Sequence, residues 1–247
     1  MSELLVNKQD ERIRRMFGQI APWYDTLNHL LSLNIDKRWR TKTTKLVPPM
    51  GTEPILDLCT GTGDLALTYD KASKGTVPIF GADFCHEMLV LARKKAERAK
   101  IAERVQFYEA DAQELPFPDD TFQIVSVAFG IRNVKEYERG LAEIIRVCRP
   151  GGRVAILEFS KPTGSIFGRF YLWYFKYLLP FIGHVFCRNA ESAYHYLPAS
   201  VLQFPDGEGF AEKLRAAGLS NVRFTPLTFG IATLYIGEKP IPQPTVT

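Results

Sequence analysis

The chain has 247 residues, 46% of them hydrophobic and 23% charged, a balance that excludes a disordered, collagen-like or disulfide-scaffold protein. Its net charge of +4 is unevenly distributed. Residues 1–50 and 159–190 each carry a net positive charge, whereas residues 51–158 between them are mildly acidic. Such an arrangement is typical of a protein that contacts a nucleic acid or an anionic membrane, and charge alone does not separate the two.

The cysteines are widely spaced and predict reduced thiols, without a disulfide or a zinc site. The first residues are charged and lack the apolar core of a secretory signal. Within the most apolar window, residues 166–187, Arg169, Lys176 and Pro180 interrupt the apolar run, so we do not expect it to span a bilayer. These features predict a cytoplasmic protein with a single domain over residues 1–247.

In chain order, residues 8–50 form an N-terminal segment with the apolar spacing of helices, and strands then alternate with amphipathic helices. Strands are predicted at 55–58, 77–82, 105–108, 122–128 and 154–159, and helices at 65–69, 88–100 and 137–148. After an aromatic insertion at 160–205 come a helix at 209–217 and two hairpin-like strands at 221–224 and 232–237. The alternation predicts an α/β fold with a mostly parallel central sheet and helices on both of its faces.

A glycine loop follows the first predicted strand, in ILDLCTGTGDLA. Gly61 and Gly63 allow backbone amides to approach a ligand closely, and ligands of open parallel sheets bind at the carboxyl ends of the strands. Asp57 precedes the loop, where it would repel a pyrophosphate but attract the ammonium and sulfonium groups of S-adenosylmethionine. The alternative is a tight strand-to-helix turn that binds nothing.

Two further acids end the next two predicted strands. Asp83 is placed to accept hydrogen bonds from both ribose hydroxyls of a nucleoside, and Asp111, with the amide of Ala112, is placed to meet an adenine edge. Each acid taken alone is equally well explained as a helix cap or turn residue. Acids at the ends of three successive strands together predict a site for a nucleoside without phosphates.

Four separate stretches carry a family resemblance: YDTLNHLLSLNIDKRW (24–39), FGIRNV (129–134), RVCRPGGRVAILEFS (146–160) and FYLWYFKYLLPFIG (170–183). With them, roughly residues 8–238 resemble the menaquinone/ubiquinone biosynthesis C-methyltransferases, which belong to the class I S-adenosylmethionine-dependent methyltransferases. The chain departs from that family's usual pattern at Leu27, Asp36 and Cys148.

The resemblance implies a Rossmann-like class I methyltransferase fold with an antiparallel last strand, and S-adenosylmethionine as cofactor. It places cofactor contacts at Thr62, Asp83, Asp111 and Ala112 and implies no metal. The implied reaction is methylation of a ring carbon of a prenylated demethylquinol, most similar to the conversion of demethylmenaquinol to menaquinol. A benzoquinol of the ubiquinone pathway, or a non-catalytic scaffold with this fold, are the alternatives.

The catalytic candidates follow from the chemistry of a quinol, whose ring carbon becomes nucleophilic when an adjacent hydroxyl, with a pKa of ~10, loses its proton. Because Arg132 and Asn133 follow the fourth strand, we predict that Arg132 stabilises the developing oxyanion and that Asn133 hydrogen-bonds a quinol oxygen. Alternatively, Arg132 pairs with a carboxylate and Asn133 caps the next helix. Tyr24 and Asp25 are second candidates, the aspartate as a general base, against a packed tyrosine and a helix cap.

The aromatic segment 159–190 contains basic residues and no acids, which predicts peripheral contact with the inner face of an anionic membrane, where a prenylated quinol resides. The alternative is an ordinary pair of core helices. No nucleic-acid partner is expected, because the chain lacks a basic tail and reads AFGIRN where base-methylating enzymes carry a motif such as Asn-Pro-Pro-Tyr. No particular oligomeric state is predicted.

Overall fold

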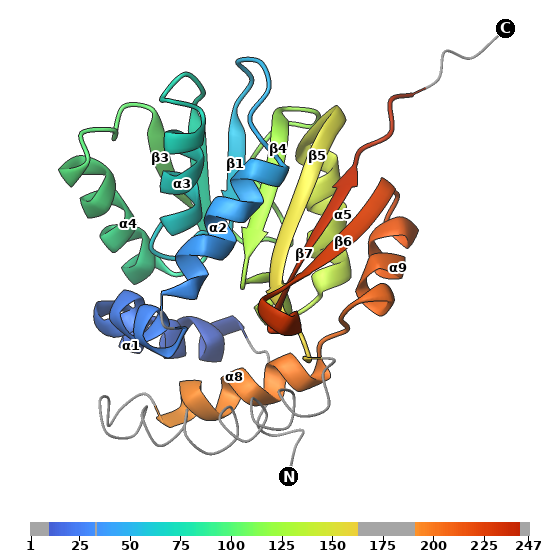
Figure 1. Cartoon of the computed structure of the whole chain (residues 1–247). Helices are drawn as coiled ribbons and strands as arrows, with labels where there is room; N and C mark the ends of the chain where they lie inside the picture. Colours follow the sequence, from blue (N-terminus) through green and yellow to red (C-terminus); the bar gives the residue numbers. More distant parts are fainter. Residues whose placement is uncertain (1–9, 33, 163–190, 243–247) are drawn as a thin grey trace, which may run out of the picture.

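A computed structural model describes residues 10–32, 34–162 and 191–242 of the chain (Figure 1). Seven strands form one sheet in the order β3-β2-β1-β4-β5-β7-β6. Their bounds are β1 (Ile55–Leu58), β2 (Ile79–Asp83), β3 (Val105–Glu109), β4 (Phe122–Ala128), β5 (Cys148–Phe159), β6 (Ser220–Leu227) and β7 (Ala232–Glu238). No helix in these ranges is long and apolar enough to cross a bilayer.

The strand order reverses direction at β1, which pairs in parallel with β2 on one side and with β4 on the other. β5 extends the parallel run, and β7 is antiparallel to both β5 and β6. In open sheets of this kind, ligands bind at the carboxyl ends of the strands beside such a reversal. The topology therefore places the candidate site at the ends of β1, β2 and β4.

Successive residues of the central strands point to opposite faces, and both faces are buried. Ile55 and Ile124 face α2 (Ile35–Leu46), α3 (Asp64–Ala72) and α4 (His86–Arg98). Leu56 and Val125 face α5 (Tyr137–Val147) and α9 (Glu208–Ala216). Because neither face is exposed to water, these strands read as continuous apolar runs, which is what identified them in the sequence.

A third apolar layer covers the carboxyl end of the sheet (Figure 1). It consists of α1 (Asp10–Leu31) and α8 (Glu191–Gln203), which pack against each other and against the start of α4. Its buried members come from all of these elements: Ile13, Met16, Ile20, Ala21, Cys85, Met88, Tyr196 and Val201. Two helices far apart in the sequence thus close one end of the sheet.

The structure confirms the predicted α/β fold, its parallel sheet and its antiparallel last strand. The predicted N-terminal helical segment divides into α1 and α2, with Asn34 in a left-handed conformation ahead of α2. β5 begins at residue 148, six residues before the prediction, because Cys148 pairs with Phe122 across an irregularity that the Pro-Gly-Gly turn creates. Of the aromatic insertion, residues 163–190 lie outside the described ranges, and residues 191–203 form α8.

Candidate functional site

The loop between β1 and α3 depends on glycine. Gly61 and Gly63 have positive φ angles of 55° and 84°. A Cβ atom on Gly63 would lie 2.9 Å from the ring of Phe107 in β3 and 3.2 Å from Ala92 in α4, so a larger residue does not fit. The loop can therefore lie flat against the sheet at the strand reversal, with its backbone close to any ligand bound there.

Asp57 is fully buried behind this loop. One carboxylate oxygen accepts hydrogen bonds from the Thr60 hydroxyl (2.6 Å) and the Ala66 amide (3.1 Å), and the other accepts one from the Ser126 hydroxyl (3.0 Å). Burial raises the pKa of Asp57 to about 6, against the opposing effect of these hydrogen bonds. Asp57 thus holds the glycine loop, α3 and β4 together, and it does not line the pocket.

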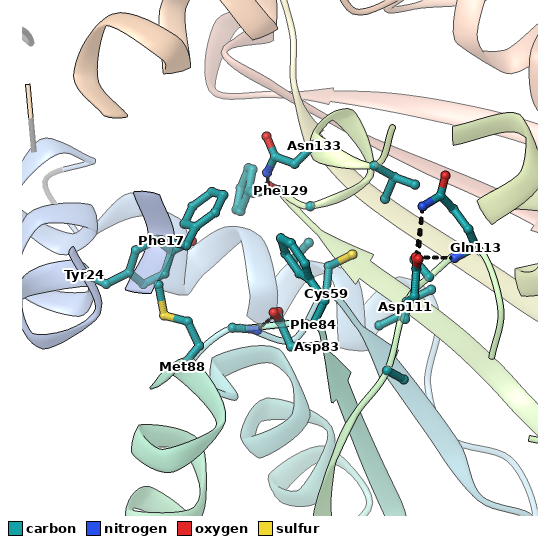
Figure 2. A pocket seen from close by; sticks show the side chains of 17 residues that line it. Phe17, Tyr24, Cys59, Asp83, Phe84, Met88, Asp111, Gln113, Phe129 and Asn133 are labelled. Atoms are coloured by element: carbon teal, nitrogen blue, oxygen red, sulfur yellow. Dashed lines mark hydrogen bonds between the residues drawn. The ribbon is translucent and has the colours of Figure 1, made fainter. Parts of the chain in front are cut away.

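The other two predicted acids do line the pocket (Figure 2). Asp83 accepts hydrogen bonds from the amides of Gly61 (2.8 Å) and Cys85 (2.9 Å), and burial raises its pKa to about 6. Asp111 accepts bonds from the amide (2.8 Å) and the side-chain nitrogen (3.1 Å) of Gln113. Both carboxylates are thus held in place by neighbouring residues while facing the same space.

The pocket lies between the ends of β1, β2 and β4 and the helix α1 (Figure 2). It comprises about 670 Å³, counting space open to solvent, which is a volume typical of small-molecule sites. Its lining is mostly apolar: Phe17, Tyr24, Leu58, Cys59, Gly61, Asp83, Phe84, Met88, Ala110, Asp111, Ala112, Gln113, Ala128, Phe129, Gly130, Asn133 and Val134. An apolar slot with fixed carboxylates suits an uncharged aromatic base joined to a ribose.

The segments that follow β1 and β4 approach each other closely where Cys59 and Gly130 line the pocket. A Cβ atom on Gly130 would lie 2.2 Å from the Cβ of Cys59, so FGIRNV needs glycine at this position. The chain then turns through η2 (Ile131–Asn133), which carries both residues predicted to contact the quinol.

Arg132 does not line the pocket. Its Nη1 lies 2.6 Å from Glu158 Oε1 in β5 and also donates to the Phe129 carbonyl oxygen, and its guanidinium lies 5.3 Å from the centre of the Phe159 ring. Both charged side chains are buried, and desolvation raises the pKa of Glu158 in spite of the arginine. This is the carboxylate pairing given above as the alternative, and the structure places no part of Arg132 in the pocket wall.

Asn133, the next residue, does line the pocket. Its side-chain nitrogen is 3.5 Å from the Phe129 carbonyl oxygen, while its Oδ1 is buried without a hydrogen-bond partner among the described residues. Arg132 Nε and the hydroxyl of Tyr196 on α8, which packs against η2, are likewise buried and unpartnered in that part of the chain. Buried polar atoms in this condition normally have water or a ligand as their partner.

Of the second pair of catalytic candidates, Tyr24 and Asp25, again only one residue lines the pocket. Tyr24 lines the pocket, and burial raises its pKa, so its phenol stays protonated at neutral pH and can act as a donor. Asp25 does not line the pocket. Its oxygens contact the Thr62 hydroxyl (2.5 Å) and Lys95 Nζ (2.6 Å), so the structure shows a bonded carboxylate where we predicted a general base. Thr62 and Gly63, predicted to contact the cofactor, do not line the pocket either.

Three potential metal ligands, His29, Asp36 and Asp64, lie within 4.8 Å of one another near the start of α2. Arg40 Nη1 lies 2.5 Å from Asp36, and its Nη2 lies 3.9 Å from Asp64. Burial opposes ionisation of Asp36, but the Ser32 hydroxyl and Arg40 outweigh it and lower its pKa. The Arg40 guanidinium already supplies a positive charge there, and the cluster joins α1, α2 and the start of α3.

Sequence reasoning missed Gln113, Glu158, Lys95 and Tyr196. Glu158 carried a signal, since an acid in the apolar strand VAILEF needs a buried partner. Lys95 carried none, because a lysine on an amphipathic helix is normally solvated.

The model of the ubiE/COQ5 methyltransferase family matches residues 5–239. The chain is 47% identical to demethylmenaquinone methyltransferase of Thermus thermophilus, over 91% of this chain and 100% of that protein. It is 45% identical to the ubiquinone/menaquinone biosynthesis C-methyltransferase UbiE of Geobacter sulfurreducens, over 95% of this chain and 91% of that protein.

Two solved structures show the same fold at low sequence identity. A possible histamine N-methyltransferase from Thermotoga maritima gives a TM-score of 0.63 at 19% identity, over 92% of this chain and 99% of that one. The [4+2]-cyclase SpnF also gives 0.63 at 19% identity, over 83% and 81%. Because proteins named for such different reactions share the fold, the fold alone does not identify the reaction.

Proposed function

The chain belongs to the ubiE/COQ5 methyltransferase family, and we propose that it methylates a ring carbon of a prenylated demethylquinol, with demethylmenaquinol as its main substrate. The family assignment confirms the predicted enzyme class and favours catalysis over a scaffold role. The identity of 47% over the full length of the Thermus demethylmenaquinone methyltransferase carries the choice of substrate.

S-adenosylmethionine is the cofactor of this family, and it supplies a methyl group on a positively charged sulfur. The pocket fits it: Asp83 presents a carboxylate for the ribose hydroxyls, and Asp111 and Ala112 border the apolar slot that suits the adenine. The amide of Gly61 already bonds Asp83, so the glycine loop fixes the carboxylate before the cofactor arrives. A preformed site of this kind avoids ordering costs on binding.

The quinol ring occupies the part of the pocket formed by Phe129, Val134 and Asn133, next to the cofactor slot. The unpartnered Oδ1 of Asn133 accepts a hydrogen bond from a ring hydroxyl, and Tyr24, which remains protonated, is a donor on the opposite wall. Phe17, Phe84 and Met88 give the pocket an apolar wall against which the ring can pack. Proximity and orientation supply most of the acceleration.

Replacing Asn133 by alanine is expected to raise the KM for demethylmenaquinol about fivefold to tenfold, the loss of one buried hydrogen bond. The affinity for S-adenosylhomocysteine should stay within twofold, because Asn133 belongs to the quinol end of the pocket. Steady-state kinetics and isothermal titration measure the two quantities separately. An equal loss of affinity for both ligands would instead place Asn133 in the cofactor site.

We further propose that the enzyme works in the cytoplasm and meets its substrate at the inner face of the membrane. A polyprenyl tail keeps the quinol in the bilayer, and α1, which lines the pocket with Phe17 and Tyr24, also carries Trp23, which is 55% exposed. Basic residues near an anionic surface each contribute about 1 kcal/mol to binding.

The test is methyl transfer from labelled S-adenosylmethionine to demethylmenaquinol and to the ubiquinone-type benzoquinol precursor, each presented in neutral and in anionic vesicles. We expect the higher kcat/KM on demethylmenaquinol and faster turnover on anionic vesicles. A preference for the benzoquinol would reassign the substrate, and equal rates on both vesicle types would remove the charge-driven part of the membrane proposal.

A further inference from the structure

The helix α1 forms one wall of the cofactor pocket. Phe17 and Tyr24 are its lining residues, and Tyr24 Cε1 lies 3.9 Å from the position of a Cβ on Gly61. In Figure 2 these two rings stand across the pocket from the strand ends that carry Asp83 and Asp111. The position of α1 therefore sets the width of the slot above the glycine loop.

Lys95, on α4, links this wall to the loop. Its ammonium lies 2.6 Å from Asp25 Oδ2, 2.9 Å from the Thr62 hydroxyl and 2.7 Å from Asp64 Oδ1. An ammonium has three hydrogens, so each of these three acceptors can receive one. The acceptors belong to α1, to the glycine loop and to the first turn of α3. The side chain of Lys95 thus links these three elements to α4.

The Thr62 hydroxyl completes a cycle of three contacts among Lys95, Asp25 and Thr62. It accepts from Lys95 and donates to Asp25 Oδ1 at 2.5 Å, while Asp25 is paired with Lys95 through its other oxygen. Thr62 is 2% exposed, and the side chains of Lys95 and Asp25 are 25% and 31% exposed. Ion pairs in such surroundings are stronger than fully exposed pairs and are less screened by salt.

Other contacts also hold α1: near its end His29 Nδ1 lies 2.9 Å from Asp36 in α2, and contacts with α4 and β3 hold its first half. Arg14 pairs with Glu109, but both side chains are nearly half exposed, which makes the pair weak. Ile13, Met16 and Ile20 pack on α4 in the first half of the helix. The contacts among Lys95, Asp25 and Thr62 come directly after Tyr24, where the helix crosses the glycine loop.

We propose that Lys95 is a positioning residue that fastens α1 to the glycine loop through Asp25 and Thr62, and so controls cofactor affinity and exchange. In this proposal Asp25 anchors α1 to Lys95 and Thr62 and does not act as a general base. The inference goes beyond the proposed quinol reaction and rests only on the cofactor. Removing Lys95 loosens the Tyr24 segment of α1, widens the slot and leaves Asp25 without its cation, while Asp64 keeps only the more distant Arg40 Nη2 at 3.9 Å.

The test compares Lys95→Met with Lys94→Met, which removes the same charge from the exposed neighbouring position. We expect Lys95→Met to raise the Kd of S-adenosylhomocysteine about fivefold to tenfold, the range for a partly buried ion pair with one hydrogen bond. Most of the change should lie in the dissociation rate, measured by surface plasmon resonance, and the KM for S-adenosylmethionine should rise more than kcat falls. Lys94→Met should stay within twofold of the wild type.

Asp25→Asn provides an independent variant in case Lys95→Met is poorly folded. It should shift the Kd in the same direction, and the double variant should be little worse than Lys95→Met alone, because the Lys95–Asp25 contact that Asp25→Asn weakens is already lost in Lys95→Met. Hydrogen exchange of the cofactor-free variants should speed up in α1 and not in β1 or β4. Strictly additive effects, an unchanged dissociation rate or unchanged exchange in α1 would overturn the proposal. None of these readouts involves a quinol, so they do not depend on the proposed substrate.

Discussion

Replacing Arg132 by methionine is expected to lower the free energy of unfolding by about 3–5 kcal/mol at pH 7, the cost of leaving a buried charge without its partner. Arg132 is 5% exposed and Glu158 is 1% exposed, and the Nη1–Oε1 distance is 2.6 Å. Chemical denaturation of the cofactor-free protein measures the change. Arg139→Met, which breaks a surface pair with Glu114, should stay within about 0.5 kcal/mol of the wild type.

The pH dependence of this loss has a defined sign. The pKa of Glu158 is raised by burial even with Arg132 present, and without the arginine it rises further. A carboxyl whose folded-state pKa exceeds its unfolded value of ~4.3 destabilises the fold above that pH and not below it. The deficit of Arg132→Met should therefore be largest at neutral pH and shrink as the pH falls towards 4.

The double variant Arg132→Met/Glu158→Leu should recover most of the lost stability, because it removes both charges together. A loss below 1 kcal/mol in Arg132→Met, or a double variant no more stable than the single one, would contradict a coupled ion pair. Loss of activity in Arg132→Met would not by itself show a catalytic role, because the same substitution disturbs η2 and with it Asn133.

Asp83→Asn is expected to raise the Kd for S-adenosylhomocysteine about tenfold to a hundredfold, because hydrogen bonds to a carboxylate are each worth about 1.5–3 kcal/mol. The amide that replaces the carboxylate would also turn a donor towards the amide of Gly61 or of Cys85, both of which now donate to Asp83. Isothermal titration measures the affinity. Glu212→Gln, an exposed change on α9, is the matched control.

Acid should mimic this substitution in the wild-type protein. Burial raises the pKa of Asp83 to about 6, so the carboxylate that accepts the ribose hydroxyls is protonated as the pH falls through 6. The affinity for S-adenosylhomocysteine should then weaken below pH 6, and this dependence should flatten in Asp83→Asn. An affinity that is constant between pH 5 and 8 would contradict the placement of the ribose at Asp83.

The sequence was most informative about features that short stretches of the chain determine, such as buried strands and the glycine loop. Both faces of β1 and β4 are buried, so short, mostly apolar runs such as ILDL identified them, and the parallel topology brought the glycine loop and the strand-end acids together. The start of β5 was misplaced because a Pro-Gly-Gly turn reads as a break, whereas the structure carries the strand through it as an irregularity.

The site was only partly predictable, because residue type and position do not specify partners. Of the predicted site residues, six line the pocket: Tyr24, Gly61, Asp83, Asp111, Ala112 and Asn133. Asp57, Asp25 and Arg132 have suitable chemistry, but each is bonded to a partner distant in the sequence: Ser126, Lys95 and Glu158. The sequence can show that a buried acid such as Glu158 needs a partner, but which residue becomes the partner depends on three-dimensional packing.

The most direct test of the proposed reaction is the position of the transferred methyl group. The enzyme is incubated with demethylmenaquinol and S-adenosylmethionine that carries a ¹³C-labelled methyl, and the oxidised product is examined by NMR. We predict that the label lies on a ring carbon, that the product is menaquinone, and that Asn133→Ala forms it at a higher KM. Label on a quinol oxygen, or no transfer by a protein that binds S-adenosylhomocysteine normally, would contradict the proposed function.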